Sequence, residues 1–372
     1  MDTNIMNMKK ITSCKRVTIK VGSNVLTRPD GSLDVTRMSS LVDQIAALRQ
    51  EGMEVILVSS GAVASGRSEL KGCVETDRKL TSVEQRQLFS AVGQAKLINR
   101  YFDLFRDYGI AAGQVLTTKE NFRSRIHYLT MRNCMNVMLQ NGVLPIVNEN
   151  DTISVTELMF TDNDELSGLI ATMMDAELLI ILSNIDGIFT GNPSDPDSEL
   201  IREVAQGKDL TEYISTVKSG FGRGGMQTKY HIARKVAEEG IAVVIANGKR
   251  ERILLDLMHQ ADVPSTCFIP VSGNVSSVKK WIANSEGFSK GAVYLNEGAT
   301  ESILGEKAAS VLPVGVTRVT GDFSAGDIVK VVDCHGREIG VGKVACDSAQ
   351  ARELVGKRNQ KALIHYDYLY LE

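Results

Sequence analysis

A glycine-rich stretch, GFGRGGMQTK at residues 220–229, places loop glycines before a predicted helix that carries Lys229 at its start. Gly220, Gly222 and Gly225 have the spacing G-x-G-x-x-G, but the preceding residues do not resemble the buried strand that a dinucleotide-binding turn requires. A helix N-terminus favours an anion through its backbone N–H groups and its dipole, and a lysine adds positive charge there. The stretch therefore indicates a phosphate site, with a flexible turn that binds nothing as the alternative. The P-loop pattern G-x-x-x-x-G-K-S/T occurs nowhere in the chain.

A second lysine, Lys20, lies late in a predicted strand at residues 17–21 and is followed closely by Gly22. Taken alone, a lysine in a strand is more often a solvated outward side chain. In a parallel sheet covered on both faces, however, a charge near the strand end needs a partner or a ligand. Gly22 would let the backbone approach such a ligand closely.

An acidic cluster, TDNDELSG at residues 161–168, comes just before a predicted helix. One Asp or Asn there is explained by capping of the helix. Three consecutive polar residues, Asp162, Asn163 and Asp164, exceed what one cap needs. The additional side chains could orient the lysines or accept a substrate amine.

The elements that must position these residues alternate in type from Arg16 to about Ala246. Short β-branched runs at 17–21, 54–61, 110–118, 143–151, 178–184 and 241–248 are separated by helical patterns, one of which has Leu41, Ile45 and Leu48 at helical spacing. This alternation predicts βαβ units and a mainly parallel sheet covered by helices on both faces. Ligands of such sheets bind beyond the carboxyl ends of the strands. Several of those ends are polar or glycine-rich. Ordinary turn chemistry explains any one of them well, but it does not explain why they recur at several strand ends.

After about Ser276 the pattern changes to short strands with glycine turns, in GAVYLNEGA, VLPVG and the segment that begins VTRVTG. We therefore expect two domains, residues 1–275 and a small β-rich domain at residues 286–372. The second domain has 10 Lys and Arg against 12 Asp and Glu, a net charge of about −2, whereas a nucleic-acid-binding surface should be basic. An interaction or regulatory role is favoured for it over RNA binding.

The overall composition is that of a globular protein, with 43% hydrophobic and 23% charged residues and a formal net charge of −3. Six scattered cysteines without a C-x-x-C pair argue against a zinc ribbon and for reduced thiols. The N-terminal residues lack the apolar segment of a signal peptide, and no run is long enough for a membrane span. A cytoplasmic protein that does not contact membranes is expected.

Taken in order, six motifs resemble the amino-acid kinase family, in particular the branch that phosphorylates the side-chain carboxylate of L-glutamate. They are VTIKVGSNVLT, VILVSSGAVASG, AVGQAKL, LPIVNENDTIS, FTDNDELSGLIA and GRGGMQTK. The resemblance extends over essentially the whole chain, because the tail from about Gly287 is similar to the PUA module of many bacterial members. It implies a three-layer αβα sandwich with a mainly parallel central sheet, followed by a PUA domain.

The reaction implied by this resemblance transfers the γ-phosphoryl group of ATP, with Mg²⁺, to L-glutamate, as the first step of proline biosynthesis. Lys20 and Lys229 would stabilise the transferring group, and Asp164 would organise both lysines. Glutamate would be held by Ser60, Gly61, Asp151 and Asn163. The residues implied for ATP are Lys20, Ser183, Asn184, Arg223, Gly224, Gly225, Met226, Gln227, Thr228 and Lys229. No metal ligand from the protein is predicted.

The resemblance also implies a homo-oligomer, a dimer or tetramer, and a separate glutamyl phosphate reductase that consumes the labile product. Ser183 and Asn184 stand where many relatives have Thr-Asp, which leaves nucleotide preference open. Two alternatives are a sister kinase for another carboxylate or carbamate, and an RNA-binding or scaffold protein. The sister kinase would differ around Ser60 and Asp151, and the scaffold would not need both lysines with the acidic cluster.

Overall fold

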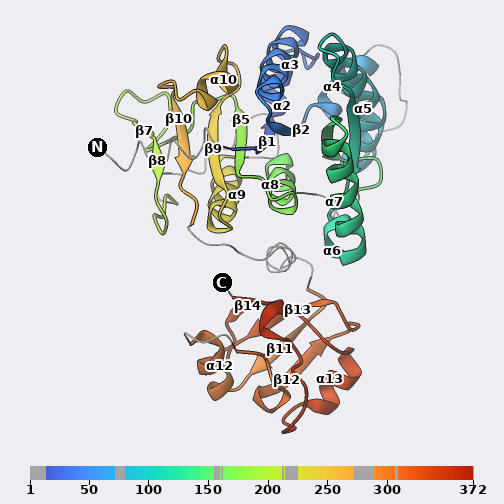
Figure 1. Ribbon diagram of the computed structural model, residues 1–372, viewed down its shortest axis with the longest axis vertical. Helices are drawn as coiled ribbons and strands as arrows, with labels where there is room; N and C mark the ends of the chain where they lie inside the picture. Colours follow the sequence, from blue (N-terminus) through green and yellow to red (C-terminus); the bar gives the residue numbers. More distant parts are fainter. Residues whose placement is uncertain are drawn as a thin grey trace. The chain divides into compact units, whose positions relative to one another are not determined.

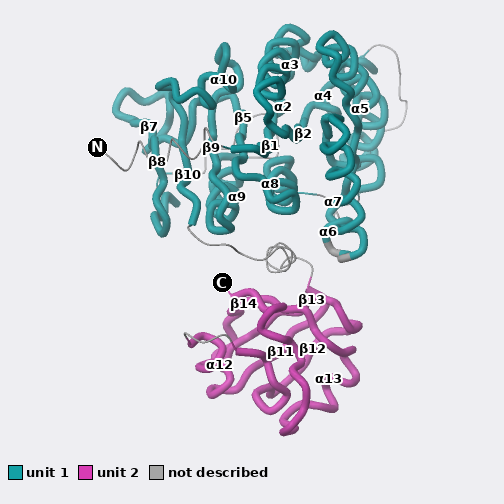
Figure 2. The backbone as a smooth tube through the Cα atoms, in the orientation of Figure 1, with its two compact units in different colours: residues 1–273 teal, residues 274–372 magenta. Residues whose placement is uncertain are grey.

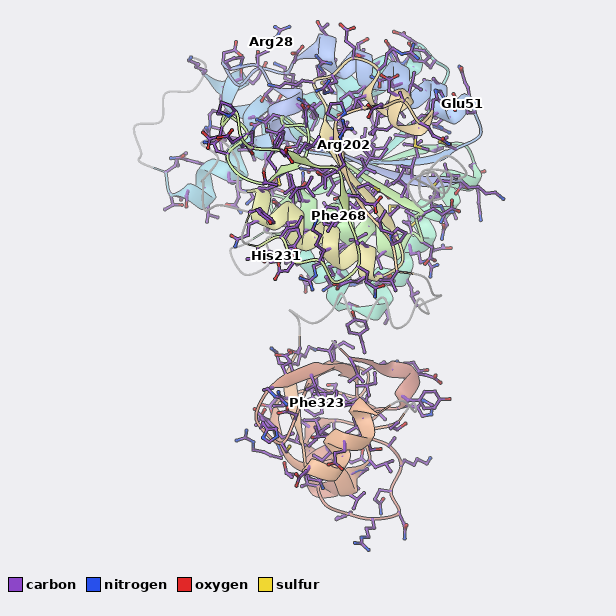
Figure 3. All side chains as sticks on the ribbon, turned by 90° about the vertical axis from the view of Figure 1, so that its left-hand side faces the viewer. Arg28, Glu51, Arg202, His231, Phe268 and Phe323 are labelled. Atoms are coloured by element: carbon purple, nitrogen blue, oxygen red, sulfur yellow. The ribbon has the colours of Figure 1, made fainter. Side chains whose placement is uncertain are left out.

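A computed structural model describes residues 14–71, 80–154, 160, 162–211, 213, 225–271, 289–305 and 309–371. The chain forms two compact units, Met1–Gly273 and Asn274–Glu372, which Figure 2 shows in different colours. Each unit has its own buried side chains, among them Phe268 in the first unit and Phe323 in the second (Figure 3). The limits predicted from the sequence, 1–275 and 286–372, remain a prediction.

The first unit is built on an eight-stranded sheet, counted over the described residues, with the order β3-β4-β2-β1-β5-β9-β10-β8. Every neighbouring pair is parallel except β9 and β10. A small hairpin pairs β6 with β7. The strands are β1 (Arg16–Val21), β2 (Glu54–Ser59), β3 (Ala112–Thr117), β4 (Leu144–Glu149), β5 (Leu178–Ser183), β6 (Ile188–Phe189), β7 (Leu200–Ile201), β8 (Glu203–Val204), β9 (Ala242–Asn247) and β10 (Ser265–Phe268).

Helices cover both faces of this sheet, as Figure 1 shows with α3 and α10 on one side and α8 and α9 on the other. The helices are α2 (Ser23–Leu26), α3 (Val35–Gln50), α4 (Ala62–Leu70), α5 (Ser82–Arg106), α6 (Lys119–Arg123), α7 (Arg125–Gln140), α8 (Asn163–Met173), α9 (Met226–Glu238) and α10 (Ile253–Met258). The three-layer, mainly parallel fold predicted from the sequence is therefore confirmed.

The two-residue period of the strands decides which side chains face which layer of helices. On β1, Val17, Ile19 and Val21 belong to the core beneath α3, α5 and α10. Thr18 and Lys20 are also buried, and their alternation with these residues turns them toward the layer of α8 and α9. Lys20 is thus buried between β1 and the layer of α8 and α9.

Helix boundaries follow local chemistry that is legible in the sequence. Asp34 caps α3 by accepting a hydrogen bond from the Arg37 N–H, and Gly52, with φ of 91°, lies just past the end of that helix. Thr81 and Glu84 form a reciprocal capping box at the start of α5. No helix within the described ranges is both long and apolar enough to cross a membrane.

The helices α4 and α5 contact each other through glycines. A Cβ atom added at Gly66 would lie 1.7 Å from the carbonyl oxygen of Phe89, and one added at Gly93 would lie 1.8 Å from that of Ala62. No side chain fits at either position, so the two backbones are in direct contact.

The second unit contains a five-stranded sheet over the described residues, with the order β12-β11-β13-β14-β15. Its pairs are antiparallel except β11 with β13. The strands are β11 (Gly291–Leu295), β12 (Val316–Gly321), β13 (Ile328–Val332), β14 (Glu338–Lys343) and β15 (Leu369–Leu371), with helices α12 (Glu297–Leu304) and α13 (Ser348–Leu354). The β-rich character predicted for this region is confirmed.

The expected strand at VLPVG is wrong. Val311 makes only an isolated bridge with Ile364, and residues Pro313–Gly315 form the 3-10 helix η3. Proline has no N–H for a strand ladder, and its fixed φ suits the first position of a helical turn.

Candidate active site

Asp164 joins two buried lysines at the carboxyl end of β1. The Nζ atom of Lys20 lies 2.5 Å from Asp164 Oδ1, and the Nζ atom of Lys229 lies 2.8 Å from Asp164 Oδ2. Asp164 is 0% exposed, and the lysines are 4% and 8% exposed. The structure thus brings the three predicted catalytic residues into one cluster, although they come from three elements far apart in the sequence.

Each member of this cluster is delivered by a different feature of the fold. Lys20 is the fifth residue of β1 and faces the layer of α8 and α9, Asp164 lies in the first turn of α8, and Lys229 lies at the end of the first turn of α9. Gly22 lies close to this cluster and to β5: its N–H donates to Leu182 O at 3.1 Å, and an added Cβ would lie 3.2 Å from that oxygen and 3.6 Å from Lys20 Nζ.

The ionisation of two neighbouring aspartates differs sharply. Burial alone would raise the pKa of Asp164, but the charges and hydrogen bonds of Lys20 and Lys229 hold it well below its usual range. Burial and the charge of Asp164 instead raise the pKa of Asp162 to about 6. Asp164 therefore remains a carboxylate at neutral pH, whereas Asp162 titrates just below it.

Asp162 is the residue that caps α8. Its Oδ1 accepts hydrogen bonds from the N–H groups of Asp164 and Glu165 at 2.9 and 3.1 Å. Its Oδ2 is buried and has no hydrogen-bond partner within the part of the chain that the structure describes. Within the acidic cluster, Asp162 therefore caps the helix, whereas Asp164 pairs with the two lysines.

Asn163 connects the acidic cluster to the end of β2. Its amide nitrogen lies 2.8 Å from Ser60 Oγ and 2.9 Å from Asn148 Oδ1. Asn148 in turn donates to Gln94 Oε1 at 2.7 Å. Gly61, the residue that precedes α4, has φ of 105°, a left-handed conformation that favours glycine. The predicted substrate residues Ser60, Gly61 and Asn163 are therefore neighbours.

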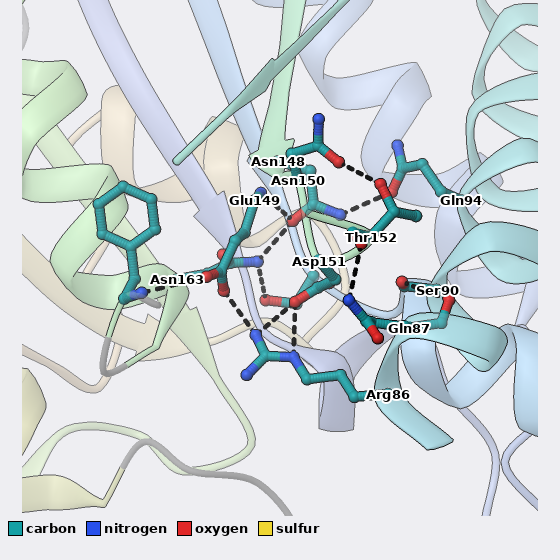
Figure 4. Close-up of polar contacts among 12 residues, drawn as sticks. Arg86, Gln87, Ser90, Gln94, Asn148, Glu149, Asn150, Asp151, Thr152 and Asn163 are labelled. Atoms are coloured by element: carbon teal, nitrogen blue, oxygen red, sulfur yellow. Dashed lines mark hydrogen bonds and ion pairs between the residues drawn. The ribbon is translucent and has the colours of Figure 1, made fainter. Parts of the chain in front are cut away.

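Asp151, the fourth predicted substrate residue, is held by Arg86 of α5 (Figure 4). The Nε atom of Arg86 lies 2.6 Å from Asp151 Oδ1, and its Nη2 atom lies 2.5 Å from Glu149 Oε2. Glu149 also accepts a hydrogen bond from the Phe160 N–H at 3.1 Å. Burial, followed by the charge of Asp151, raises the pKa of Glu149. One guanidinium therefore lies between two carboxylates at the end of β4.

The predicted nucleotide residues are placed in part. Ser183 ends β5 and is buried, Asn184 is exposed, and Gly248 N–H donates to Ser183 O at 2.8 Å. Gly225 is the N-cap residue of α9 and has no side chain that could accept a hydrogen bond. The first turn of the helix, which includes Met226, Gln227 and Thr228, is therefore not capped by a side chain. Arg223 and Gly224 lie outside the described residues.

Sequence reasoning missed Arg86 and Glu149 as members of this region. Glu149 lies within the motif LPIVNENDTIS, so the sequence does contain a signal that could have identified it. Arg86 lies in the same helix as the motif AVGQAKL, at residues 91–97, but five residues before it begins, and only the tertiary structure brings Arg86 to the end of β4.

Comparison with known proteins agrees with this architecture. Residues 15–247 match the amino acid kinase family, and residues 291–366 match the PUA domain. Carbamate kinase from Giardia lamblia bound to AMP-PNP is similar in fold, with a TM-score of 0.53 at 16% identity, and covers 70% of this chain and 100% of its own. The fold is that of an amino acid kinase.

Relatives with high sequence identity narrow the class. Glutamate 5-kinase of Bacteroides thetaiotaomicron is 67% identical over 358 residues, covering 96% of this chain and 98% of the relative. Glutamate 5-kinase of Chlorobaculum tepidum is 48% identical over 363 residues, covering 96% and 97%. The chain belongs to the glutamate 5-kinase family, phosphotransferases of the first step of proline biosynthesis.

Proposed function

We propose that this chain transfers the γ-phosphoryl group of ATP to the side-chain carboxylate of L-glutamate, with Lys20, Asp164 and Lys229 as its catalytic residues. The observation that carries this proposal is the bridge from one buried carboxylate to two buried ammonium groups at the carboxyl end of β1. Phosphoryl transfer is catalysed mainly by positioning and by stabilisation of charge, and this cluster can supply both.

The acceptor needs no general base. A glutamate side chain has an ordinary pKa of about 4.3, so at neutral pH its carboxylate already carries the electron pair that attacks phosphorus. An acceptor oxygen forms a bond to the γ-phosphorus while the bond to the β–γ bridging oxygen breaks and ADP leaves. The barrier arises from the approach of two anions, and we assign its reduction to the Nζ groups of Lys20 and Lys229.

Asp164 would keep the two ammonium groups at a fixed separation. Its two oxygens contact one lysine each, so neither side chain can turn away without losing its ion pair. Both lysines lie in a nearly water-free environment, where their charge acts on a phosphoryl group more strongly than it would in water. Asp164 is thus proposed as the residue that positions the charges in advance of the reaction.

We assign glutamate to Ser60, Gly61, Asn163 and Asp151. The acidic Asp151 suits the α-ammonium group, and the hydroxyl and amide of Ser60 and Asn163 suit carboxylate or carbonyl oxygens. These residues follow β2 and β4 or open α8, so they share the sheet edge at which parallel α/β folds bind ligands.

We assign ATP to Ser183, Asn184 and the first turn of α9, with Arg223 and Gly224 of the preceding loop. The uncapped N-terminus of α9 presents N–H donors and a positive dipole end to a phosphate. Lys20, Lys229 and Asp164 together carry a formal charge of +1, much less than an ATP polyphosphate requires. This deficit fits Mg²⁺ held by the phosphate oxygens, which would neutralise charge on the transferring group.

We further propose the wider setting that accompanies this activity. Residues 1–275 would form the catalytic domain and residues 286–372 the PUA domain of a cytoplasmic homo-oligomer, a dimer or tetramer. We also propose that a separate reductase consumes the product, which as an acyl phosphate is labile. The acidic balance of the PUA domain favours a role other than nucleic-acid binding.

The test is ADP release by the purified chain with ATP and Mg²⁺, comparing L-glutamate with L-aspartate, N-acetyl-L-glutamate and carbamate. Hydroxylamine in the assay traps an acyl phosphate as its hydroxamate. We expect turnover with L-glutamate alone and a trapped γ-hydroxamate. Turnover confined to another acceptor would keep the phosphate site and reject the glutamate assignment.

A matched pair of variants tests the catalytic residues in the same assay. Lys229→Met should abolish most turnover, whereas Lys235→Met, further along α9, should retain it. Equal activity of the two variants would reject the role assigned to Lys229.

A further inference from the structure

An amino acid acceptor brings two charges besides the reacting carboxylate, and the site described so far supplies an opposite charge for one of them. Asp151 suits the α-ammonium group, and Ser60 and Asn163 offer neutral donors to carboxylate oxygens, but no cation has been assigned to the α-carboxylate, whose removal from water is costly without a charged partner. Lys20 and Lys229 are both engaged by Asp164 and lie where the phosphoryl group transfers.

Among the described residues, Arg86 is a cation that contacts Asp151 directly. Its side chain is 16% exposed, and its Nε atom is 2.6 Å from Asp151 Oδ1. The guanidinium of Arg86 and the carboxylate of Asp151 thus lie in contact. Their charges are complementary to the carboxylate and the ammonium group that share one carbon in an α-amino acid. Adding a zwitterion there leaves the net charge of the cluster unchanged.

The position of Arg86 is firmly set by its helix and its partners. It lies in the second turn of α5, whose start is fixed by the capping box of Thr81 and Glu84. A second carboxylate, Glu149, contacts its Nη2 atom at 2.5 Å and keeps the guanidinium turned toward the end of β4 (Figure 4). A guanidinium has five N–H donors in a planar fork, so it can engage a third carboxylate while keeping its contact with Asp151.

We propose that Arg86 is a specificity-determining residue that binds the α-carboxylate of the acceptor, beside the α-ammonium group on Asp151. This inference rests on the proposed function. A simple dicarboxylate does not carry an α-ammonium group and an α-carboxylate on one carbon, so it could not engage Asp151 and Arg86 together. The site would therefore select amino acids over simple dicarboxylates. The competing explanation is that Arg86 only positions Asp151 and never touches the acceptor.

Two acceptors that differ in one charge separate these explanations. L-isoglutamine keeps the reacting carboxylate and the α-ammonium group of L-glutamate but carries a neutral carboxamide in place of the α-carboxylate. We would measure kcat/KM for both in the full-length chain and in Arg86→Gln, using competitive inhibition constants where isoglutamine turns over too slowly. Gln87→Ala, which alters the half-buried neighbour that donates to Thr152 O, is the matched control.

We expect the unaltered chain to prefer L-glutamate over L-isoglutamine by about 30-fold or more, the range for loss of a buried charged hydrogen-bonded partner. Arg86→Gln should lower kcat/KM for L-glutamate by a similar factor and leave L-isoglutamine within about threefold, so that the preference disappears. Gln87→Ala should keep it. If Arg86→Gln proves poorly folded, Arg86→Lys is measured instead. Because lysine keeps the positive charge but lacks the planar fork, this variant should keep part of the preference for L-glutamate.

A parallel loss with both acceptors in Arg86→Gln would show a positioning role only and would overturn the proposal. So would an unaltered chain that does not distinguish the two acceptors. Absence of L-glutamate turnover in the unaltered chain would instead overturn the proposed function, so the two failures are distinguishable.

Discussion

Replacing Asp164 with Asn tests the electrostatic account of the site most directly. The substitution keeps the size of the side chain and removes the negative charge that contacts both Lys20 and Lys229. Breaking a buried ion pair by removing one partner costs about 3–5 kcal/mol, because the remaining charge is left without compensation. With two lysines affected and Asp164 fully buried, we expect Asp164→Asn to lower the free energy of unfolding by about 4 kcal/mol at neutral pH.

The same substitution two residues earlier should have the opposite sign. Asn at position 162 keeps an oxygen that can cap α8 and removes a carboxylate that burial and Asp164 destabilise. Its pKa is about 6 against an ordinary 3.8, and one pKa unit corresponds to about 1.4 kcal/mol. We therefore expect Asp162→Asn to raise the free energy of unfolding by at most about 3 kcal/mol at pH values above 6.

The pH dependence of the two variants follows from these pKa directions. The folded pKa of Asp162 is raised, so its cost is absent near pH 4, develops as the pH rises toward 6 and is full above that. The folded pKa of Asp164 is depressed, so its stabilisation is full above about pH 5 and is lost as the pH falls below the unfolded value of about 3.9. The gain of Asp162→Asn should thus vanish near pH 4, where the penalty of Asp164→Asn begins to shrink.

Urea unfolding followed by circular dichroism, at about pH 4 and about pH 8, measures both variants. Because the chain has two units, the transition of the first unit is compared among variants, with that of the second unit as an internal reference. A gain for Asp162→Asn that does not change between these pH values would refute the assigned titration. An Asp164→Asn variant as stable as the unaltered chain would refute the bridging role of Asp164.

Three further substitutions address catalysis, packing and capping. Lys229→Met should lower kcat for ADP release at least about 100-fold, the usual loss when a preorganised charge is removed, and a change confined to KM would contradict a role in the transition state. Gly66→Ala should destabilise the first unit by about 3 kcal/mol, because its Cβ would meet the Phe89 carbonyl oxygen at 1.7 Å; an unchanged melting temperature would show that the helices separate freely. Thr81→Ala should cost about 1 kcal/mol in urea unfolding through loss of the cap on the Glu84 N–H, and a negligible loss would mean that the start of α5 is held by other contacts.

The fold could be predicted from the sequence because its signals are local. Apolar runs such as LLIILS at 178–183 can be buried only in a sheet covered on both faces, and Gly52 and Gly240 lie just past the ends of α3 and α9, as their left-handed φ values favour. The order of the strands, with β1 between β2 and β5, is a long-range property that no local pattern specifies.

The candidate site could be predicted only as far as its residues lie in recognisable motifs. Lys20, Asp164 and Lys229 each belong to one, and their meeting follows from the edge of a parallel sheet. Arg86 has no such motif, and its partners lie more than sixty positions away, at the end of β4 and just after it. The titration of Asp162 depends on its distance to a neighbouring charge and on its burial, which sequence spacing does not supply.

The glycine contact between α4 and α5 has a consequence for attempts to change the acceptor. The helix α4 begins directly after Gly61, and α5 carries Arg86. In the proposed acceptor site, two sides are therefore attached to helices whose backbones already touch, so trimming a side chain cannot bring these helices closer. If that proposal is correct, an acid longer or shorter than glutamate would have to be fitted by exchanging side chains such as Ser60 or Arg86. Redesign of this enzyme should accordingly concentrate on those positions and leave Gly66 and Gly93 unchanged.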